Sequence, residues 1–224
     1  MVPVFPRWIW LWVVLLPVVA GAVNVTALLF LQHGGITHLT GLTSEAAAAV
    51  GILDVRLVAR AGLVIFLYCL GCAVSGYVYR LPRWAPTVRA SVLLAGEATL
   101  IAVAADSTLP PLSCLACLGL AMGVQNGLST VLSGAVVRTS HLTGMFTDAA
   151  VALGQAAGGA SWDRRRVVLC MAVISSFVMG GVLAGAGFRS AGLAVLWMPA
   201  AIAASTAAVT LGLALRRARR RRAA

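Results

Sequence analysis

The sequence contains no lysine, and its 224 residues include only 6 acidic side chains and 3 histidines against 17 arginines. Charged residues make up 10% of the chain, whereas about 25% is usual in a soluble protein. So little charge excludes a disordered chain and an ordinary cytosolic enzyme. The net charge of +11 does not indicate a nucleic-acid partner, because the arginines lie between apolar runs and at the C-terminus, where membrane topology explains them better.

Long apolar runs dominate what is present. Hydrophobic residues make up 61% of the chain, and the mean hydropathy is +0.97. A membrane-spanning helix needs about 20 apolar residues. Six segments meet this requirement and predict an all-α, polytopic protein of the lipid bilayer with six transmembrane helices: Trp8–Leu31, Ala61–Tyr79, Val88–Ala105, Leu112–Leu132, Val167–Gly187 and Gly192–Leu215. The alanine-rich stretches Glu45–Val58 and Asp148–Ala160 are too short to span and predict short helices between them.

The arginines predict the orientation of the chain. Arg7 and Ala20-Gly21-Ala22 imitate a signal peptide, but the apolar run continues to Leu31, so we expect an uncleaved first span. With the N-terminus in the cytoplasm, only Arg56, Arg60 and Arg189 fall on outside segments. The positive-inside rule therefore predicts that both termini are cytoplasmic.

An internal similarity predicts a duplication. Residues 37–51, THLTGLTSEAAAAVG, resemble residues 140–154, SHLTGMFTDAAVALG, and Gly21-x-x-Asn24 resembles Gly123-x-x-Asn126. We expect a first repeat over 1–107, a second over 108–215 and an arginine-rich cytoplasmic tail over 216–224, all in one membrane domain. Each repeat holds three spans, so the second must enter the membrane from the opposite side. Such inverted repeats are typical of secondary transporters, whose sites lie at the repeat interface.

The matched H-L-T-G turns supply candidate substrate-binding residues. Each turn precedes a short helix whose first turn Thr40 or Thr43, or their counterparts, can cap. We expect the turns to approach each other near mid-membrane as broken or re-entrant helices, whose N-termini favour an anion or a carbonyl group. The candidates are Asn24, Thr37, His38, Thr40, Gly41, Gln125, Asn126, Ser140, His141, Thr143 and Gly144. The alternatives are that the histidines brace the turns and that the amides join helices.

Four charged residues are candidates for coupling or gating: Glu45, Glu97, Asp148 and Arg138. Glu45 and Asp148 are matched between the repeats, and each alternatively stabilises a helix start. Glu97 lies inside a span, where a carboxylate costs roughly 2.5–3.5 kcal/mol on insertion scales. It either has a functional role or pairs with Arg138 or another buried polar group.

Other patterns indicate packing rather than chemistry. The Cys69-x-x-Cys72 and Cys114-x-x-Cys117 pairs lack a nearby histidine, so packing is favoured over redox or metal chemistry. No nucleophile elbow, zinc-protease motif or phosphate loop is present, so we expect no enzymatic activity, metal or cofactor. The glycines at 119, 123 and 127 predict close packing of one helix against a neighbour in the chain or across a homodimer.

The chain resembles the YoaK-like family of bacterial membrane proteins, which carries domain of unknown function 1275. The resemblance rests on the H-L-T-G turns, on Gly123-x-Gln125-Asn126 and on the RTSHLTG run that begins at Arg138, and it covers nearly the whole chain. Asn24 stands where the family has Asp, and Leu42 where Asn often follows Thr-Gly, so proton titration at position 24 is not expected. The resemblance implies an integral protein of the bacterial inner membrane and no established activity.

These patterns favour a small secondary transporter or channel for a small polar solute, with an anion as one candidate. The first alternative is a non-transport membrane partner or regulatory protein. The second is an intramembrane enzyme.

Overall fold

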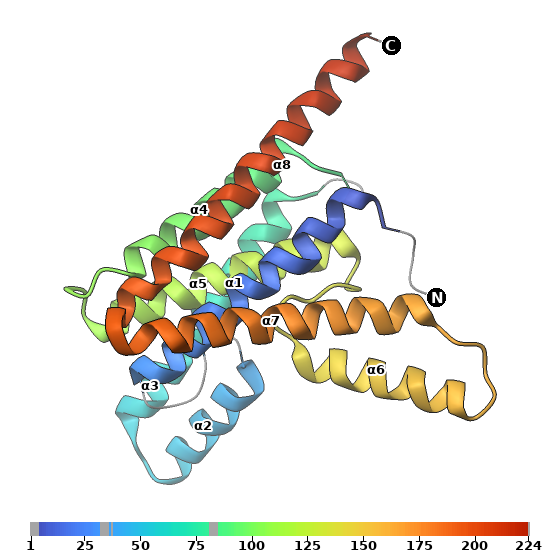
Figure 1. The fold of residues 1–224 in the computed structure, drawn as a ribbon. Coiled ribbons are helices and arrows are strands. Elements are labelled where there is room, and N and C mark those ends of the chain that lie inside the picture. The colour runs from blue at the N-terminus through green and yellow to red at the C-terminus, as the bar shows by residue number, and fades with distance from the viewer. Residues whose placement is uncertain (1–4, 32–35, 37, 81–84, 224) are drawn as a thin grey trace.

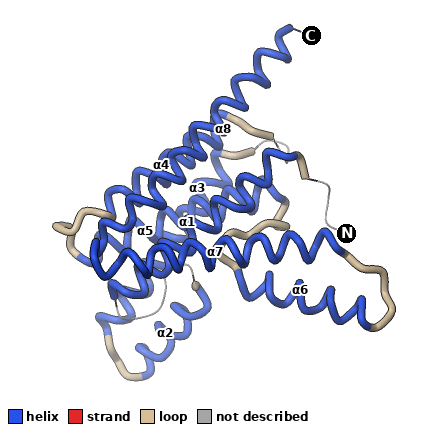
Figure 2. Tube along the Cα trace, viewed as in Figure 1, coloured by secondary structure: helices blue, strands red, loops and turns tan. Residues whose placement is uncertain are grey.

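The structure is a computed structural model that describes residues 5–31, 36, 38–80 and 85–223. Every regular element in this part of the chain is a helix (Figures 1 and 2). In chain order they are α1 (Arg7–Leu31), α2 (Leu39–Gly51), α3 (Val55–Val78), α4 (Val88–Ala104), α5 (Pro111–Ser133), α6 (Leu142–Ala157), α7 (Arg164–Ala191), the 3-10 helix η1 (Gly192–Leu196) and α8 (Trp197–Ala223). The predicted all-α class is confirmed.

Several helices are long and apolar enough to cross a membrane. Four candidate spans meet both requirements: most of α1, all of α3, all of α5 and the continuous stretch Arg164–Arg222, which contains α7, η1 and α8. At about 1.5 Å per residue, the 24 residues of α3 extend about 36 Å, against a hydrocarbon core of about 30 Å. Helix α4 has 17 residues, near the lower limit for a span. These helices indicate a multi-pass membrane protein.

The outer surface of the bundle is apolar, as a lipid-facing surface must be. Phe66 on α3, Val92 on α4 and Val182 on α7 are each more than 60% exposed. Large exposed apolar surfaces are rare on soluble monomers. In a bilayer the same side chains contact lipid, while the backbone polar groups are satisfied within each helix.

Local sequence signals set the helix boundaries. The Asp54 carboxylate accepts hydrogen bonds from the backbone N–H groups of Arg56 and Leu57 at 3.1 and 3.0 Å and begins α3. Asp163 accepts one from the N–H of Arg166 at 3.1 Å and begins α7. Both helices therefore start before the predicted spans at Ala61 and Val167, because aspartate satisfies N–H groups that the first turn leaves free.

The predicted threonine caps of the first short helix are wrong. His38 occupies the N-cap position of α2 without a side-chain cap bond. Thr43 instead donates its hydroxyl to the carbonyl of Leu39 at 2.8 Å, within the helix. Thr40 is the second residue of α2, just inside the position from which a side chain caps.

The long helices interlock across the sequence. Helix α1 packs along α7, and α3 packs along α5 (Figure 1). Helix α4 contacts both α5 and α8, and α8 also contacts α1. The short helices fold back as hairpins, α2 on α3 and α6 on α7. Segments that are far apart in sequence therefore form the centre of the bundle.

Glycines bring two pairs of helices into backbone contact. A Cβ atom at Gly123 of α5 would overlap the carbonyl of Tyr68 on α3, and one at Gly127 would lie 2.7 Å from the Cα of Cys72. A Cβ at Gly21 of α1 would likewise overlap the carbonyl of Phe177 on α7. The glycine series at 119, 123 and 127 thus packs α5 against a helix of its own chain, the first of its two predicted roles.

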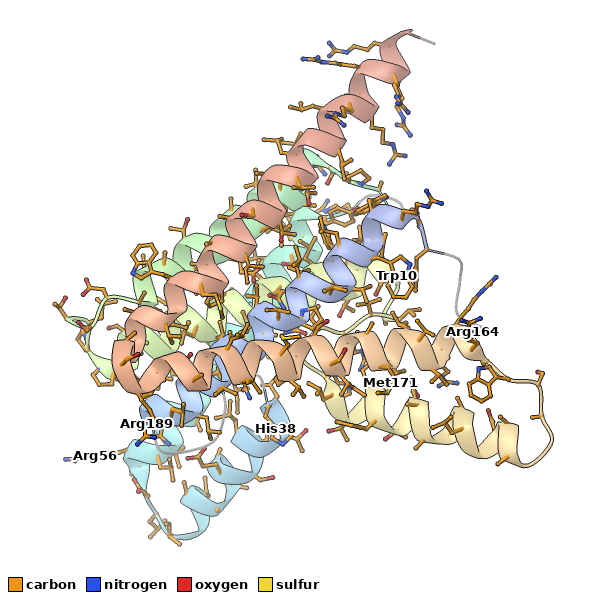
Figure 3. All side chains as sticks on the ribbon, viewed as in Figure 1. Trp10, His38, Arg56, Arg164, Met171 and Arg189 are labelled. Atoms are coloured by element: carbon orange, nitrogen blue, oxygen red, sulfur yellow. The ribbon has the colours of Figure 1, made fainter. Side chains whose placement is uncertain are left out.

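The ends of the bundle differ in their arginines (Figure 3). Arg56 and Arg189 lie together at one end, whereas Arg164 lies at the far end of α7. The last turns of α8, which carry Arg216 to Arg222, extend beyond the rest of the bundle.

Candidate functional site

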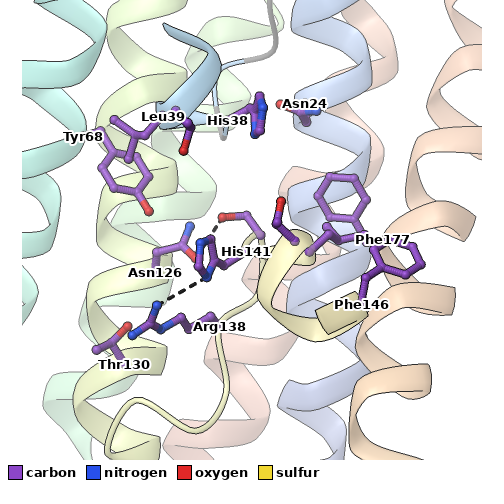
Figure 4. A pocket seen from close by; sticks show the side chains of 14 residues that line it. Asn24, His38, Leu39, Tyr68, Asn126, Thr130, Arg138, His141, Phe146 and Phe177 are labelled. Atoms are coloured by element: carbon purple, nitrogen blue, oxygen red, sulfur yellow. Dashed lines mark hydrogen bonds between the residues drawn. The ribbon is translucent and has the colours of Figure 1, made fainter. Parts of the chain in front are cut away.

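One cavity of about 740 Å³ receives both H-L-T-G turns (Figure 4). It is called the shared cavity below. Residues of α1, α2, α3, α5, α6 and α7 line it, together with the segment between α5 and α6: Asn24, His38, Leu39, Thr40, Tyr68, Asn126, Thr130, Arg138, Ser140, His141, Leu142, Thr143, Phe146 and Phe177. Leu39 and Leu142 are the first residues of α2 and α6, so both short helices begin at the cavity.

Most of the predicted binding residues meet here. The cavity wall includes Asn24, His38, Thr40, Asn126, Ser140, His141 and Thr143, as well as Arg138 from the predicted gating set. Thr37 lies outside the described residues. Gln125, Gly41 and Gly144 are not on the wall of this cavity.

The two predicted glycines make room for the histidine rings. A Cβ at Gly41 would lie 2.5 Å from the ring of His38, and a Cβ at Gly144 would lie 3.1 Å from the ring of His141. Each ring therefore folds over the first turn of the helix that its own residue precedes. The bracing alternative for the histidines thus has a physical basis, and it is compatible with exposure of the same rings to the cavity.

A buried hydrogen-bond network holds the segment before α6 against α5. The Gln125 side-chain amide donates to Thr139 Oγ1 at 2.7 Å and to the carbonyl of Leu16 on α1 at 3.0 Å. Thr139 and Ser140 both donate to Asn126 Oδ1, at 3.2 and 3.0 Å. The two amides therefore hold the loop that carries Arg138. Because Gln125 also bonds to α1, it joins helices, as the alternative to a substrate contact predicted.

Arg138 supplies the cavity's cationic group. Its side chain is exposed, and one guanidinium nitrogen lies 3.3 Å from Nδ1 of His141 (Figure 4). Among the described residues, no carboxylate forms an ion pair with it. A guanidinium is always charged and binds carboxylate or phosphate oxygens through two parallel hydrogen bonds.

The matched carboxylates lie elsewhere, each paired with an arginine of the following long helix. Glu45 contacts Arg60 and Asp148 contacts Arg166, both at 2.7 Å. The predicted role at a helix start is wrong, because each carboxylate lies beyond the first turn of its helix, where the helix dipole has little effect. No carboxylate is among the described residues that line the shared cavity.

Glu97 is isolated from this site. It is fully buried in α4, and neither carboxyl oxygen has a hydrogen-bond partner among the described residues. The predicted pairing with Arg138 is not formed, because the polar contact of Arg138 is with His141 on the loop side of α6. The role of Glu97 in coupling stays a prediction.

A second cavity of about 420 Å³ adjoins the first. Arg138 and His141 line both, and the second cavity also receives Asp148, Asp163 and Arg166 from α6 and the start of α7. The Arg138–His141 pair therefore stands between the two cavities.

The cysteines form no disulfide in the described structure, and one of them lies in a helix contact. All five are free thiols, and Cys72 Sγ donates to the carbonyl of Gly123 at 3.2 Å, where α3 and α5 are closest. No group of three or more histidine, cysteine or acidic side chains is placed to hold a metal ion in the described residues.

Sequence reasoning missed the aromatic part of the cavity wall. Tyr68 and Phe177 resemble ordinary packing residues of apolar helices, and Phe146 stands in the segment 140–154 at the position that Thr43 occupies in the segment 37–51. One signal was available: Tyr68 follows Asp54 by the same interval as Phe177 follows Asp163, and both aspartates begin a long helix.

The long apolar helices indicate a multi-pass α-helical membrane protein, and the shared cavity is lined by both polar and aromatic side chains. A family model described as protein of unknown function (DUF1275) matches residues 12–209, so the chain belongs to that family, as the resemblance predicted. No curated protein and no solved structure matches the chain.

Proposed function

We propose that this protein is a small secondary transporter or channel for an anionic solute, built from two inverted three-helix halves that share one site. The observation that carries the proposal is that both H-L-T-G turns and Arg138 line one cavity. The remaining support comes from the pairing of the helices, the charges near the cavity and the second cavity beside it.

The helix contacts support the inverted duplication. If α1 to α4 correspond to α5 to α8, the packing of α1 on α7 corresponds to that of α5 on α3, and the two hairpins correspond to each other. His38 and His141 have nearly equal backbone angles, with φ of −98° and −91° and ψ of 70° and 63°. The two ion pairs, each 2.7 Å long and joining a short helix to the next long one, also correspond.

The six-span topology is part of this proposal. It takes α1, α3, α4, α5, α7 and α8 as the spans and gives both termini to the cytoplasm. Arg56 and Arg189 then lie on the outer side and Arg164 on the inner side, in agreement with the two ends seen in Figure 3. The arginine-rich end of α8 becomes a cytoplasmic tail that anchors the orientation.

The electrostatics of the shared cavity favour an anion. Two helix N-termini begin at its wall, and each carries partial positive charge and free N–H groups. Arg138 adds a full charge, and the histidine rings offer further hydrogen bonds. Glu45 and Asp148 would repel an anion, but the ion pairs with Arg60 and Arg166 neutralise their charges.

In this proposal the second cavity is the route from the shared cavity to one side of the membrane. It extends from the Arg138–His141 pair toward Asp163 and Arg166 at the start of α7, near the end of the bundle that carries Arg164. In the proposed orientation this is the cytoplasmic side. The Arg138–His141 pair then acts as the inner gate.

Flux into proteoliposomes tests the proposal. Radiolabelled nitrate, phosphate, methanesulfonate and benzenesulfonate are supplied separately, since the natural solute is unidentified. We expect saturable uptake of at least one anion above protein-free liposomes, its loss in Arg138→Gln and in the double variant His38→Ala/His141→Ala, and its retention in Arg189→Gln. Uptake of none of the four, or equal uptake by all variants, contradicts the proposal. Saturable binding without uptake instead supports the regulatory alternative.

A further inference from the structure

We infer that the solute of the shared cavity is an amphipathic organic anion, with an acidic head group and an apolar or aromatic body; this inference rests on the proposed function. The observations that carry it are the size of the cavity and the separation of Arg138 from the phenyl rings of Phe146 and Phe177.

The cavity is too large for a bare inorganic ion. Its volume of about 740 Å³ lies within the range of roughly 300–1,000 Å³ typical of sites for organic ligands. An ion such as nitrate, held at Arg138, would leave most of this space unfilled. The apolar side chains around that space would then face water without a ligand to cover them.

Arg138 and the phenyl rings of Phe146 and Phe177 lie on different sides of His141 (Figure 4). Arg138 lies on one side of the ring, against α5. Phe146 and Phe177 lie together on the other side, where α6 and α7 meet. A ligand that places its acidic group on the guanidinium therefore extends its body past His141 toward the two phenyl rings.

Both phenylalanines have accessible surface that the apolar body of a ligand can contact. Phe146 is 55% exposed although it lines the cavity, and Phe177 is partly exposed. Apolar sites with a few placed polar groups are the usual architecture of small-molecule pockets. Aromatic rings also gain from contacts with another ring beyond the area that is buried.

The head group is expected to be a carboxylate or a chemically similar oxyanion. Arg138 presents a planar fork of N–H donors, which matches the two oxygens of a carboxylate. The N–H groups at the start of α6, next to His141, can bind the same anion.

Sulfonates test the inference, because they stay ionised and do not cross lipid as neutral acids. The measurement is inhibition of labelled methanesulfonate uptake by unlabelled benzenesulfonate and by unlabelled methanesulfonate. We expect benzenesulfonate to inhibit at a concentration at least tenfold lower. Phe146→Ala/Phe177→Ala should remove most of that difference in inhibitory concentration, whereas Arg138→Gln should abolish the uptake of labelled methanesulfonate. Phe66→Ala, on an exposed face of α3, is the matched control and should change neither.

The outcomes separate the two proposals. Equal inhibition by the two sulfonates, with saturable uptake of methanesulfonate, overturns the amphipathic solute and leaves anion transport standing. If neither sulfonate is transported, the shift in melting temperature that each causes in the purified protein decides the point. A larger stabilisation by benzenesulfonate that depends on Phe146 and Phe177 supports the inference, and equal or absent stabilisation overturns it.

Discussion

The contact between α3 and α5 has no room for one additional methyl group, so we expect a substitution that adds one to lower the stability of the protein. A Cβ at Gly123 would overlap the backbone carbonyl of Tyr68, which cannot rotate away as a flexible side chain would. The two helices must separate or shift to accept alanine there. Overpacking of this kind costs about 1–3 kcal/mol.

The matched control lies on the helix across the contact. A Cβ at Gly76 of α3 meets nothing within 4 Å, so Gly76→Ala adds a methyl group without a clash. Alanine inside a helix is favoured over glycine by roughly 0.5–1 kcal/mol, so this control should be neutral or slightly stabilising. The two substitutions are chemically identical and differ only in what the new carbon meets.

Intrinsic tryptophan fluorescence of the purified protein in detergent, followed on heating, measures the difference. With about 2–4 °C per kcal/mol for a chain of this size, Gly123→Ala should lower the melting temperature by about 2–12 °C. Gly21→Ala should behave similarly, because its new Cβ would overlap the carbonyl of Phe177. A melting temperature of Gly123→Ala equal to that of Gly76→Ala would refute the close packing of α3 and α5.

Three further predictions follow from the charges. Asp148→Asn should lower the free energy of unfolding by less than about 1 kcal/mol, because both side chains of the pair with Arg166 are more than a third exposed. In thermal unfolding, the swap Asp148→Arg/Arg166→Asp should recover part of this loss. A swap that is less stable than either single variant contradicts the pairing. In a cysteine-free background, Arg189→Cys and Arg164→Cys should react with an impermeant maleimide from opposite sides of the membrane, and labelling from one side would refute the proposed topology. Glu97→Gln should fold with nearly unchanged melting temperature, since its carboxyl oxygens have no partner in the described structure, whereas Glu97→Lys should not; strong destabilisation by Gln would show a partner for the carboxyl that the structure lacks.

The long helices were predictable because apolar runs of spanning length leave the chain few alternatives. In a bilayer, backbone groups must be satisfied within each segment, so such a run becomes a helix whatever its neighbours are. Boundaries were less predictable. The early starts of α3 and α7 depend on Asp54 and Asp163, whose capping role is local but lies outside the apolar run that marks each span.

The site was predictable as far as the similarity between residues 37–51 and 140–154 indicated it. The matching turns led to His38 and His141 and to the expectation that they lie near each other, and both line the shared cavity. The ion pairs were not predictable, because Arg60 and Arg166 follow their partners by different intervals and reach them only through a hairpin. Phe146 was missed because an aromatic residue in an apolar chain carries no mark of whether it packs or faces a cavity, and Phe177 had only its spacing from Asp163 to indicate it.

The most direct test of the account is the position of a bound anion in an experimental structure. Crystals grown with 4-iodobenzenesulfonate would reveal the iodine by its anomalous scattering. We expect one peak inside the shared cavity, on the side of Phe146 and Phe177, with the sulfonate oxygens at Arg138. An iodine peak elsewhere, with the wild-type cavity empty at saturating ligand, would contradict it.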